Sequence, residues 1–450
     1  MAAEAAALTG PFTWVGTSVE GGRVELEYRI GDDLSFTEVV EFDVDLPDTP
    51  AVARAVHVLH LVAGVSYYKC VAPTLLVLPP VTADERALVE ALYDQGLREF
   101  AYRNGFAVPM AVEIAVDPAG DLPAPGPAPA AGVGALVPIG GGKDSALVAS
   151  LVPGSQLFAV NPVGAHRHLA AALGRPLLGA SRTLDPQLRE LVAWGVPNGH
   201  VPVTAITSAI SVLAALALGL HDVLMGIERS ADEASLVTPD GVAVNHQFSK
   251  SVEAEGMLRA VFAPTGVRYL SLLRPLSELA IGAGVARCGL AADIVSCNQV
   301  FTVWNENRSS REQRPCGECA KCLFTALMLA PSSTPAAIEA QYGRALLDDD
   351  AHVAPTRDLW STEKPFDCVG ERLETAAAVV LLHRTDGWRH QVVVRALAQE
   401  AQAMLDEAGI DPIEFLRIGP LEDLPAEYRE ALAGLSPDLA AVPGLSPASS

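Results

Sequence analysis

The sequence predicts an α/β protein in which helices flank a parallel sheet, with an α+β domain before the sheet and a helical region after it. Residues 12–47 alternate apolar and polar side chains, as the strands of a meander do. From residue 133, short apolar runs alternate with helical patterns, which indicates βα units and a parallel sheet. From about residue 334, helical patterns predominate. These three patterns, in this order, define the fold class.

The first region contains three predicted strands and two predicted helices. Alternating runs at 12–14, 24–28 and 36–42 predict the strands of the meander. Helical periodicity follows over residues 51–65 and 84–100.

A stretch rich in proline, alanine and glycine, residues 117–131, marks the clearest domain boundary, because such a composition forms an extended linker. We predict an N-terminal α+β domain (1–120) followed by a linker (121–132). A domain of βα units with a cysteine cluster (133–330) and a mostly helical C-terminal region (331–450) come next.

Residues 201–220 form the one candidate membrane span, because they are nearly free of charge. However, Pro202, several alanines and several hydroxyl side chains dilute the stretch, and a strand pattern follows at 223–227. Strands are also expected at 157–160 and 178–182. We therefore expect a buried αβ unit at this point rather than a membrane span.

Composition limits the function classes that fit the chain. The 450 residues can bury a substantial core, and half of them are hydrophobic. The net charge is −23 and no basic run occurs, so we expect no nucleic-acid partner, because neutralising phosphates requires clustered lysine and arginine. Seven cysteines, three of them close together, indicate metal or thiol chemistry in a reducing cytoplasm rather than a disulfide framework. The first residues do not read as a signal peptide, and we expect a cytoplasmic protein.

A strand, a glycine turn and a helix start follow one another in residues 135–148. The strand covers 135–139, and three consecutive glycines form the turn before Asp144 and Ser145 open the helix. Glycine lets backbone N–H groups approach an anion closely, and a helix N-terminus adds the positive end of its dipole. We therefore predict a phosphate-binding loop.

Two common phosphate loops do not fit this stretch. A Walker A loop requires Gly-x4-Gly-Lys-[Ser/Thr], but Asp144 follows Lys143, and Val137 stands at the first glycine position. A Gly-x-Gly-x-x-Gly loop fails because Ser145 occupies the last glycine position. The remaining pattern resembles the PP-loop of the ATP pyrophosphatases, Ser-Gly-Gly-x-Asp-Ser, with Gly140 in place of the leading serine. A simple glycine turn is the alternative, but it gives Lys-Asp-Ser at the helix start no packing purpose.

This resemblance implies the adenine nucleotide alpha-hydrolase-like fold and a reaction in which ATP is cut between its α and β phosphates to adenylate a substrate. ATP and Mg²⁺ are the implied ligands, with Asp144 on the metal. Asn161, at the end of the next predicted strand, is expected to line the same site. The predicted ATP-binding residues are Gly140, Gly141, Gly142, Lys143, Asp144, Ser145 and Asn161.

The cysteine cluster is the second strong signal. Cys316, Cys319 and Cys322 stand at two-residue gaps, and Cys297 lies upstream. Four thiolates suit a closed tetrahedral Zn²⁺ site, although the spacing alone also allows an iron–sulfur cluster or buried cysteines without a metal. Resemblance to the deazaguanine nitrile synthases, PP-loop enzymes with a similar zinc knuckle, favours structural zinc. The gap after Cys297 is longer here than in that knuckle.

Several polar stretches are candidates for substrate binding. Tyr67 and Tyr68 stand beside Lys69, and Arg98 ends a predicted helix; core packing explains the two tyrosines equally well. Residues 228–233 follow a predicted strand at the edge where ligands lie in open α/β sheets. Arg274 precedes a proline, where it would hold a phosphate or carboxylate or cap a neighbouring element.

Lysine is rare in this arginine-rich chain. The five lysines each lie in a locally unusual stretch, which marks them as positions where arginine would not serve. They are Lys69, Lys143, Lys250, Lys321 and Lys364.

Taken in order, these motifs resemble one family, the ATP-dependent UDP-N-acetylmuramoyl-L-alanyl-L-glutamate epimerases of bacterial peptidoglycan synthesis. The resemblance covers most of the chain up to about residue 385. The motifs begin at Ser66, Gly140, Asn198, Glu228, His246, Leu272, Cys316 and Lys364.

The implied reaction is chemically coherent. The α-proton of a glutamate carboxylate is very weakly acidic, because its removal adds charge to an anion. Adenylation by ATP and Mg²⁺ removes that anion, a base takes the proton, the proton returns on the other face, and water releases the D-glutamyl product and AMP. Lys143 and the glycine backbone would hold the leaving pyrophosphate.

For proton transfer we predict Cys368, which lies outside the cysteine cluster among polar neighbours, with His246 or Glu228 as its counterpart. Lys250, in the His246 motif, completes the predicted catalytic set. The UDP-MurNAc-dipeptide is the implied small-molecule partner. The predicted substrate-binding residues are Tyr67, Tyr68, Lys69, Arg98, Arg229, Arg274 and Lys364.

Two alternatives share parts of this pattern. A PP-loop ligase, or a thiolation or nitrile-forming enzyme, would use the same loop and knuckle but join the adenylate to ammonia or sulfur. A non-enzymatic ATP-binding regulator would release no pyrophosphate. The acidic chain argues against tRNA as the substrate of a thiolation enzyme.

Overall fold

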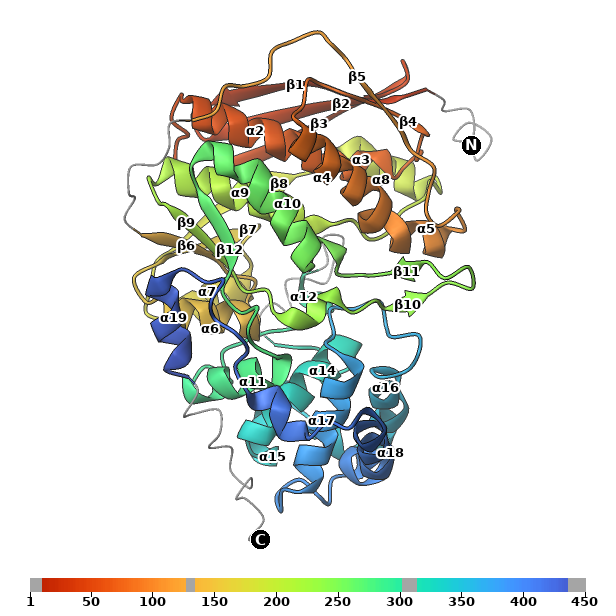
Figure 1. Cartoon of the computed structure of the whole chain (residues 1–450), viewed down its shortest axis with the longest axis vertical. Helices are drawn as coiled ribbons and strands as arrows, with labels where there is room; N and C mark the ends of the chain where they lie inside the picture. Colours follow the sequence, from red (N-terminus) through yellow and green to blue (C-terminus); the bar gives the residue numbers. More distant parts are fainter. Residues whose placement is uncertain (1–9, 127–133, 302–313, 436–450) are drawn as a thin grey trace.

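The computed structural model describes residues 10–126, 134–301 and 314–435. A β-rich part and a helical part lie at opposite ends of the molecule, and the parallel strands lie between them (Figure 1).

One large sheet organises the described residues. Its ten strands follow the order β12-β9-β6-β7-β8-β3-β2-β1-β4-β5. A separate two-stranded hairpin joins β10 (Leu236–Val237) to β11 (Ala243–Val244). The strands of the large sheet are β1 Phe12–Glu20, β2 Arg23–Ile30, β3 Leu34–Phe42, β4 Leu75–Leu78, β5 Glu113–Val116, β6 Ala135–Pro138, β7 Gln156–Val160, β8 Leu177–Thr183, β9 Asp222–Met225 and β12 Arg268–Ser271.

The predicted meander is confirmed, because β1, β2 and β3 pair antiparallel in sequence order. Its connection to the rest of the sheet was not predicted. β3 pairs antiparallel with β8, and a buried ion pair between Glu38 and Arg182 (2.7 Å) ties the two strands together. The N-terminal strands and the βα units therefore share one sheet; the division at residues 121–132 stays a prediction.

The parallel half of the sheet determines where the site lies. β12, β9, β6, β7 and β8 all run parallel. Their carboxyl ends therefore meet at one edge, which is the edge where open α/β sheets bind ligands. The segments that follow β6, β7, β9 and β12 carry most of the predicted site residues.

Helices cover both faces of this sheet, as predicted. Val137 of β6 points into one apolar core and Leu136 into the other, because successive side chains of a strand face opposite sides. The helices up to the cysteine cluster are α2 Pro50–Ala63, α3 Val65–Tyr68, α4 Ala83–Asp94, α5 Arg98–Asn104, α6 Lys143–Leu151, α7 Gly164–Ala172, α8 Pro186–Ala193, α9 Val203–Ala217, α10 Val252–Phe262, α11 Glu278–Arg287 and α12 Asn298–Phe301.

The predicted helical C-terminal region is also confirmed, and it packs on α11. Its helices are α14 Ala320–Leu329, α15 Pro335–Tyr342, α16 Val353–Asp358, α17 Arg372–His383, α18 Val392–Ala408 and α19 Ala426–Ala433. α9 is the buried helix that the sequence predicts between two strands. Within the described ranges, no helix is both long and apolar enough to cross a bilayer.

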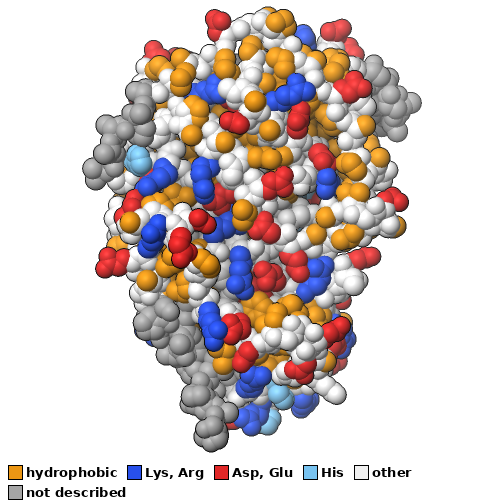
Figure 2. All heavy atoms as spheres, viewed as in Figure 1, with side chains coloured by type: hydrophobic (Ala, Val, Ile, Leu, Met, Phe, Trp, Pro, Cys, Tyr) orange, Lys and Arg blue, Asp and Glu red, His pale blue; other side chains and the backbone are white. Residues whose placement is uncertain are grey.

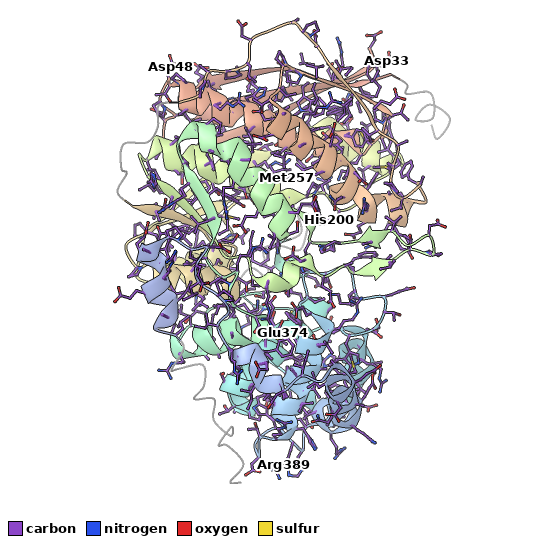
Figure 3. The ribbon with its side chains drawn as sticks, viewed as in Figure 1. Asp33, Asp48, His200, Met257, Glu374 and Arg389 are labelled. Atoms are coloured by element: carbon purple, nitrogen blue, oxygen red, sulfur yellow. The ribbon has the colours of Figure 1, made fainter. Side chains whose placement is uncertain are left out.

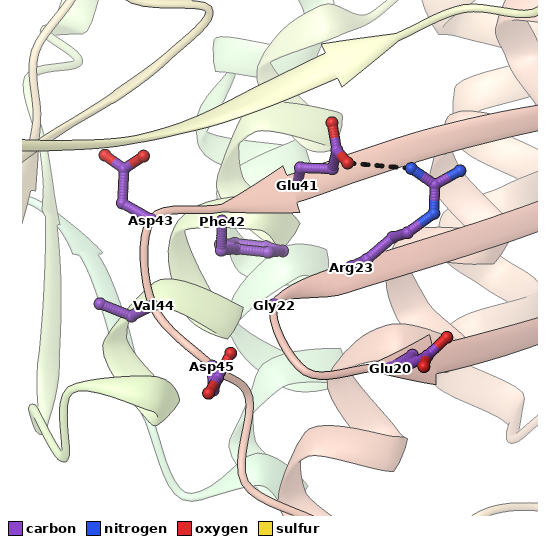
Figure 4. A pocket seen from close by; sticks show the side chains of 8 residues that line it. All are labelled: Glu20, Gly22, Arg23, Glu41, Phe42, Asp43, Val44 and Asp45. Carbon is purple, nitrogen blue, oxygen red and sulfur yellow. Dashed lines mark hydrogen bonds and ion pairs between the residues drawn. The ribbon is translucent and has the colours of Figure 1, made fainter.

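The surface offers few simple clues to function. Acidic and basic side chains are interspersed on the face shown in Figure 2. A shallow pocket opens where β3 ends, lined by residues such as Arg23, Glu41 and Asp45 (Figure 4). Because β3 runs antiparallel to β8, this pocket lies at the sheet edge opposite the carboxyl ends of the parallel strands.

Candidate active site

The glycine loop forms as predicted between β6 and α6. Gly141 has a φ of +74°, a conformation that favours glycine, and Gly142 caps the helix. Ser145 holds the loop together: its Oγ accepts from the N–H of Gly140 (3.1 Å) and donates to the carbonyl of Gly142 (3.3 Å). The turn therefore presents backbone at the start of a helix, as a phosphate cradle requires.

Two neighbouring segments press closely on this loop. Gly226, just after β9, lies so near α6 that a Cβ there would stand 2.9 Å from the carbonyl carbon of Asp144. On the other side, the N–H of Val295 donates to the carbonyl of Gly141 (2.7 Å). The position of the loop is thus fixed by backbone contacts from both sides.

Lys143 and Asp144 form an ion pair at the helix start. Lys143 is buried, and its Nζ also pairs with Glu278 of α11. Burial works against the charge on Asp144, but Lys143, and then Lys321 and Lys250, hold its pKa below the usual value. Asp144 therefore stays an anion, and its side chain keeps 30% of its surface exposed.

Further carboxylates gather around this pair. Burial raises the pKa of Glu228, and the charge of Asp144 raises it further. The pKa of Glu278 is also raised well above its usual value, first by burial. Glu228 accepts from the N–H of Ser230 at the start of a short 3-10 helix, Arg229–Asp232. An accessible anion beside further carboxylates is a donor set that suits a hard cation such as Mg²⁺.

Asn161 ends β7 at the same sheet edge. Its φ is +50°, and its side chain accepts from the N–H of Arg182 (2.7 Å) and donates to the carbonyl of the same residue (3.2 Å). These bonds join β7 to β8 beyond the regular ladder. The contact of Asn161 with a nucleotide stays a prediction.

A second group of side chains, here called the thiol cluster, consists of Cys368, His246, Glu99, His200 and Lys250. The Nζ of Lys250 lies 3.5 Å from the Sγ of Cys368. The Nδ1 of His246 lies 2.5 Å from the Oε2 of Glu99, and the same ring hydrogen-bonds Cys368. The ring of His200 stacks at 4.2 Å on that of His246.

The electrostatics of the thiol cluster favour a charged pair. Burial opposes a thiolate, but Lys250, Lys321 and His246 hold the pKa of Cys368 well below its usual value. Burial likewise opposes the charge on His246, but its bonds with Cys368 and Glu99 raise its pKa to about 9. We therefore assign a thiolate and an imidazolium at neutral pH.

Distant parts of the chain build the thiol cluster. Glu99 comes from α5. Lys250 is the last residue of the 3-10 helix Phe248–Lys250, which follows β11. Cys368 lies in the loop before α17, and the side chain of Gln247 holds that loop by donating to the carbonyl of Val369 (3.2 Å). Figure 3 shows His200 in the middle of the molecule, between the β-rich part and the helical part.

Lys250 and Lys321 connect the phosphate loop to the thiol cluster. Both act electrostatically on Asp144 and also on Cys368. Arg274 bonds the carbonyls of Glu228 and Lys250, and Gly226, just before Glu228, lies against Asp144. The two groups of side chains therefore lie close to each other.

Arg274 serves the site by holding its backbone. Its guanidinium donates to the carbonyls of Glu228 (2.9 Å) and Lys250 (2.6 Å) and pairs with the buried Glu255 (2.7 Å). Of the two roles that the sequence allows, capping of neighbouring segments is the one that these contacts support.

Lys364 and Arg229 lie at the junction with the C-terminal region. Lys364 is buried, pairs with Glu233 and donates to the carbonyl of Gly370 (3.0 Å). Arg229 makes a longer ion pair with Glu371 (3.8 Å) and lies over the ring of Phe415. Arg229 keeps 38% of its side chain exposed, so it is the more available of the two cations.

The first predicted substrate stretch lies mostly inside the protein. The rings of Tyr67 and Tyr68 are buried and pack against other aromatic rings of the N-terminal core. Lys69 donates to the side chain of Asn198 (2.6 Å), and burial lowers its pKa to about 8. Arg98 pairs with Asp94, one helical turn before it. Substrate contacts of these four residues stay a prediction.

The four cysteines come together as the sequence predicts. Their Sγ atoms all lie within 4.8 Å of one another, with Cys319 and Cys322 3.5 Å apart and Cys316 and Cys322 3.7 Å apart. Tetrahedral coordination at a Zn–S distance of about 2.3 Å requires sulfurs about 3.8 Å apart. The N–H of Cys316 also points at the Sγ of Cys297 (3.4 Å). The donor set therefore fits zinc.

Some residues of the site were not singled out from the sequence. Glu99 was not singled out, and His200 lies in the motif that begins at Asn198 but was given no role. The packing of α5 and the 198–200 loop against the His246 segment reveals both. Glu278 stands at a helix start, where an acidic residue is ordinary. Lys321 had a usable signal, because it is one of the five rare lysines and lies inside the cysteine cluster.

A glycine loop at the carboxyl edge of a parallel sheet, close to a cluster of cysteine, histidine and lysine side chains, is the arrangement of an α/β enzyme. Residues 5–272 match the family model described as the MurL N-terminal domain, and residues 293–410 match the MurL C-terminal domain. The chain belongs to the MurL family.

Relatives of similar length support this assignment. A protein of Salinispora tropica is 39% identical over 428 residues, 91% of each chain. A Micromonospora protein is 39% identical over 88% of this chain, and one from Xanthomonas oryzae pv. oryzae is 37% identical over 84%. All three are named UDP-N-acetyl-alpha-D-muramoyl-L-alanyl-L-glutamate epimerase. The chain is therefore an enzyme of the epimerase class.

Proposed function

We propose that this enzyme converts the terminal L-glutamate of UDP-MurNAc-L-Ala-L-Glu to D-glutamate in the cytoplasm, for peptidoglycan synthesis, and that adenylation by ATP drives the conversion. The observation that carries the proposal is that a glycine loop and the thiol cluster lie close together. Lys250 contacts the Cys368 sulfur at 3.5 Å, and Arg274 bonds the carbonyls of both Lys250 and Glu228. The names of the three relatives supply the substrate.

The nucleotide half of the site prepares the carboxylate. The backbone of Gly140, Gly141 and Gly142 and the start of α6 would hold the phosphates, with Lys143 close to the leaving pyrophosphate. Asp144 would hold Mg²⁺, which neutralises phosphate charge when it is bound. Removing the carboxylate charge is what makes the α-hydrogen acidic enough to exchange.

The thiol cluster acts on the α-carbon. We assign this chemistry to Cys368, together with His246 or Glu228 as the proton-transfer group, with Lys250 stabilising the negative charge that develops. Support comes from the 3.5 Å contact between Lys250 and the Cys368 sulfur and from the raised pKa of His246, about 9, which keeps a proton available at neutral pH.

The anionic groups of the substrate need arginine or lysine side chains that do not already form close ion pairs with carboxylates of the protein. Arg229 is partly exposed and makes only a long ion pair, and Lys69 donates to the neutral Asn198. These two are the proposed contacts for phosphate or carboxylate groups of the substrate. Lys364 and Arg274 would act indirectly, because their donors hold neighbouring segments.

Zinc is proposed as a structural ion at the four cysteines. Four metal–sulfur bonds would hold the segment that contains Cys297 in place. Val295, in the same segment, donates a hydrogen bond to Gly141 of the glycine loop, so the ion would also help to position that loop.

The test is incubation with UDP-MurNAc-L-Ala-L-Glu, ATP and Mg²⁺, followed by chiral analysis of the glutamate and measurement of AMP and pyrophosphate. We expect D-glutamate to form together with AMP, and deuterium from ²H₂O to enter the α-position. If ATP is consumed while the glutamate stays L, the proposal is wrong. An amide or thio product would instead identify a ligase or a thiolation enzyme.

A further inference from the structure

The side chain of His246 lies between those of Glu99 and Cys368. The carboxylate of Glu99 holds the Nδ1 of His246 at 2.5 Å, and the same imidazole hydrogen-bonds the Cys368 thiol. Glu99 is only 4% exposed, so this contact is shielded from water. A thiol, an imidazole and an orienting carboxylate form the arrangement that activates a sulfur nucleophile in unrelated folds.

The same contacts make Cys368 and His246 a poor pair for moving a proton between the two faces of one carbon. Groups that serve opposite faces must have the carbon between them, whereas His246 lies close enough to Cys368 to lower the pKa of its thiol, and Glu99 holds the His246 ring in place. A thiolate held among cations is also a weak base. Its nucleophilicity suffers less, because nucleophilicity falls only about half as steeply as basicity.

We propose that Cys368 accepts the glutamyl group from the acyl-adenylate, so that the α-carbon is epimerised while it is held as a thioester. This inference rests on the proposed function. The Sγ thiolate attacks the acyl carbon and a C–S bond forms, while the C–O bond to the phosphate breaks and AMP leaves with the electron pair. Nothing is oxidised or reduced in this step.

The thioester explains the other members of the site. Its carbonyl carries no anionic charge, so the α-hydrogen stays acidic after AMP has left. Lys250, 3.5 Å from the sulfur, is placed to stabilise the oxygen of the enolate. The proton then moves between His246 on the side of the sulfur and Glu228, the remaining buried acid. Finally, water attacks the carbonyl and the C–S bond breaks, so that the D-glutamyl carboxylate leaves and the thiolate is regenerated with release of two protons.

Glu99 becomes a positioning residue in this scheme. It touches His246 and not the reacting atoms, and its charge holds the imidazolium that stabilises the thiolate. Replacing it should therefore change the pH dependence of the thiol rather than the fold alone.

The first experiment is acid quenching of the enzyme with substrate, ATP and Mg²⁺, followed by mass spectrometry of the cysteine peptides. We expect an adduct of substrate minus water on Cys368 that hydroxylamine removes and that requires ATP. Glu228→Gln should accumulate the adduct, because proton transfer is blocked after acyl transfer. Cys288→Ala, which removes an exposed cysteine outside both clusters, should leave the adduct unchanged.

A second experiment separates the half-reactions. Cys368→Ala should retain ATP–pyrophosphate exchange with the substrate but lose AMP release and α-hydrogen exchange by at least about 10³-fold. Glu99→Gln should move the pH midpoint of Cys368 alkylation by iodoacetamide upward, whereas Glu90→Gln, on the exposed face of α4, should not.

The outcomes distinguish the two proposals. If wild-type enzyme forms D-glutamate but neither it nor Glu228→Gln carries an adduct on Cys368, the thioester is refuted and the epimerase proposal stands. Continued epimerisation by Cys368→Ala would refute the thioester and also the assignment of proton transfer to Cys368, while the proposed conversion of L-glutamate to D-glutamate would stand. If no D-glutamate forms at all while ATP is consumed, the proposed function itself fails.

Discussion

Gly226 tests whether backbone packing sets the position of the phosphate loop. In Gly226→Ala the new Cβ would lie 2.9 Å from the carbonyl carbon and 3.0 Å from the nitrogen that join Asp144 to Ser145, where ordinary contacts begin at 3.4 Å. Both atoms are backbone, so the start of α6 must move by several tenths of an ångström. Forcing a methyl group into a packed interior costs about 1–3 kcal/mol.

We expect Gly226→Ala to lower the free energy of unfolding by about 2 kcal/mol. The displaced Asp144 and loop N–H groups should also raise the KM for ATP in pyrophosphate exchange by about tenfold, which corresponds to about 1.4 kcal/mol. Urea denaturation and exchange kinetics measure the two effects.

Gly256→Ala is the matched control, because its Cβ would meet nothing within 4 Å on the exposed side of α10. Alanine in a helix is more favourable than glycine, so this variant should be about 0.5–1 kcal/mol more stable with unchanged ATP kinetics. A Gly226→Ala enzyme with normal stability and a normal KM for ATP would show that the close approach does not position the loop.

Three further predictions follow from buried groups. Arg274→Met should lower the free energy of unfolding by about 3 kcal/mol and reduce kcat, because Glu255 loses a buried partner and the segments of Glu228 and Lys250 are no longer held together. Arg259 is the exposed partner of the same Glu255, so Arg259→Met should cost less than about 1 kcal/mol in the same urea denaturation. Cys322→Ala should abolish stoichiometric zinc in metal analysis and cost more than about 3 kcal/mol, and a full zinc complement in that variant would refute the four-cysteine site. Burial raises the pKa of Glu374 to about 8 in the folded protein, whereas the same carboxyl in the unfolded chain loses its proton near pH 4.5. The free energy of unfolding therefore falls as the pH rises from 4.5 to 8. Glu374→Gln should therefore gain stability over wild type from pH 5 to pH 8, and parallel urea curves at the two pH values would contradict the burial argument.

The sequence predicts the conformation of the glycine loop and the meeting of the four cysteines well, because the residues of each are close together in the chain. Gly140 to Ser145 need only a strand before them and a helix after them, and both are local patterns. The helices also follow their periodicity, with α2 and α9 close to the expected bounds. Local structure and local chemistry are therefore the reliable part of the prediction.

The thiol cluster could be predicted only in part, because its members meet through tertiary packing. Cys368 and His246 stand in polar motifs that indicate a catalytic role. No sequence pattern near Glu99 predicts that its carboxylate, on α5, contacts His246. The docking of the N-terminal region depends on the pairing of β3 with β8, which no local pattern encodes. Tyr67 illustrates the reverse difficulty, since an aromatic residue beside a lysine fits a site and a core equally well.

The four-cysteine cluster and the proposed reaction site are connected by two segments of the chain. The segment that carries Cys297 also donates from Val295 to the loop carbonyl of Gly141. Lys321, between Cys319 and Cys322, acts electrostatically on both Asp144 and Cys368. A zinc ion bound as proposed would fix both stretches, and with them the position of the glycine loop and of Lys321. A cysteine cluster far along the chain would in this way support a site that begins with a glycine loop.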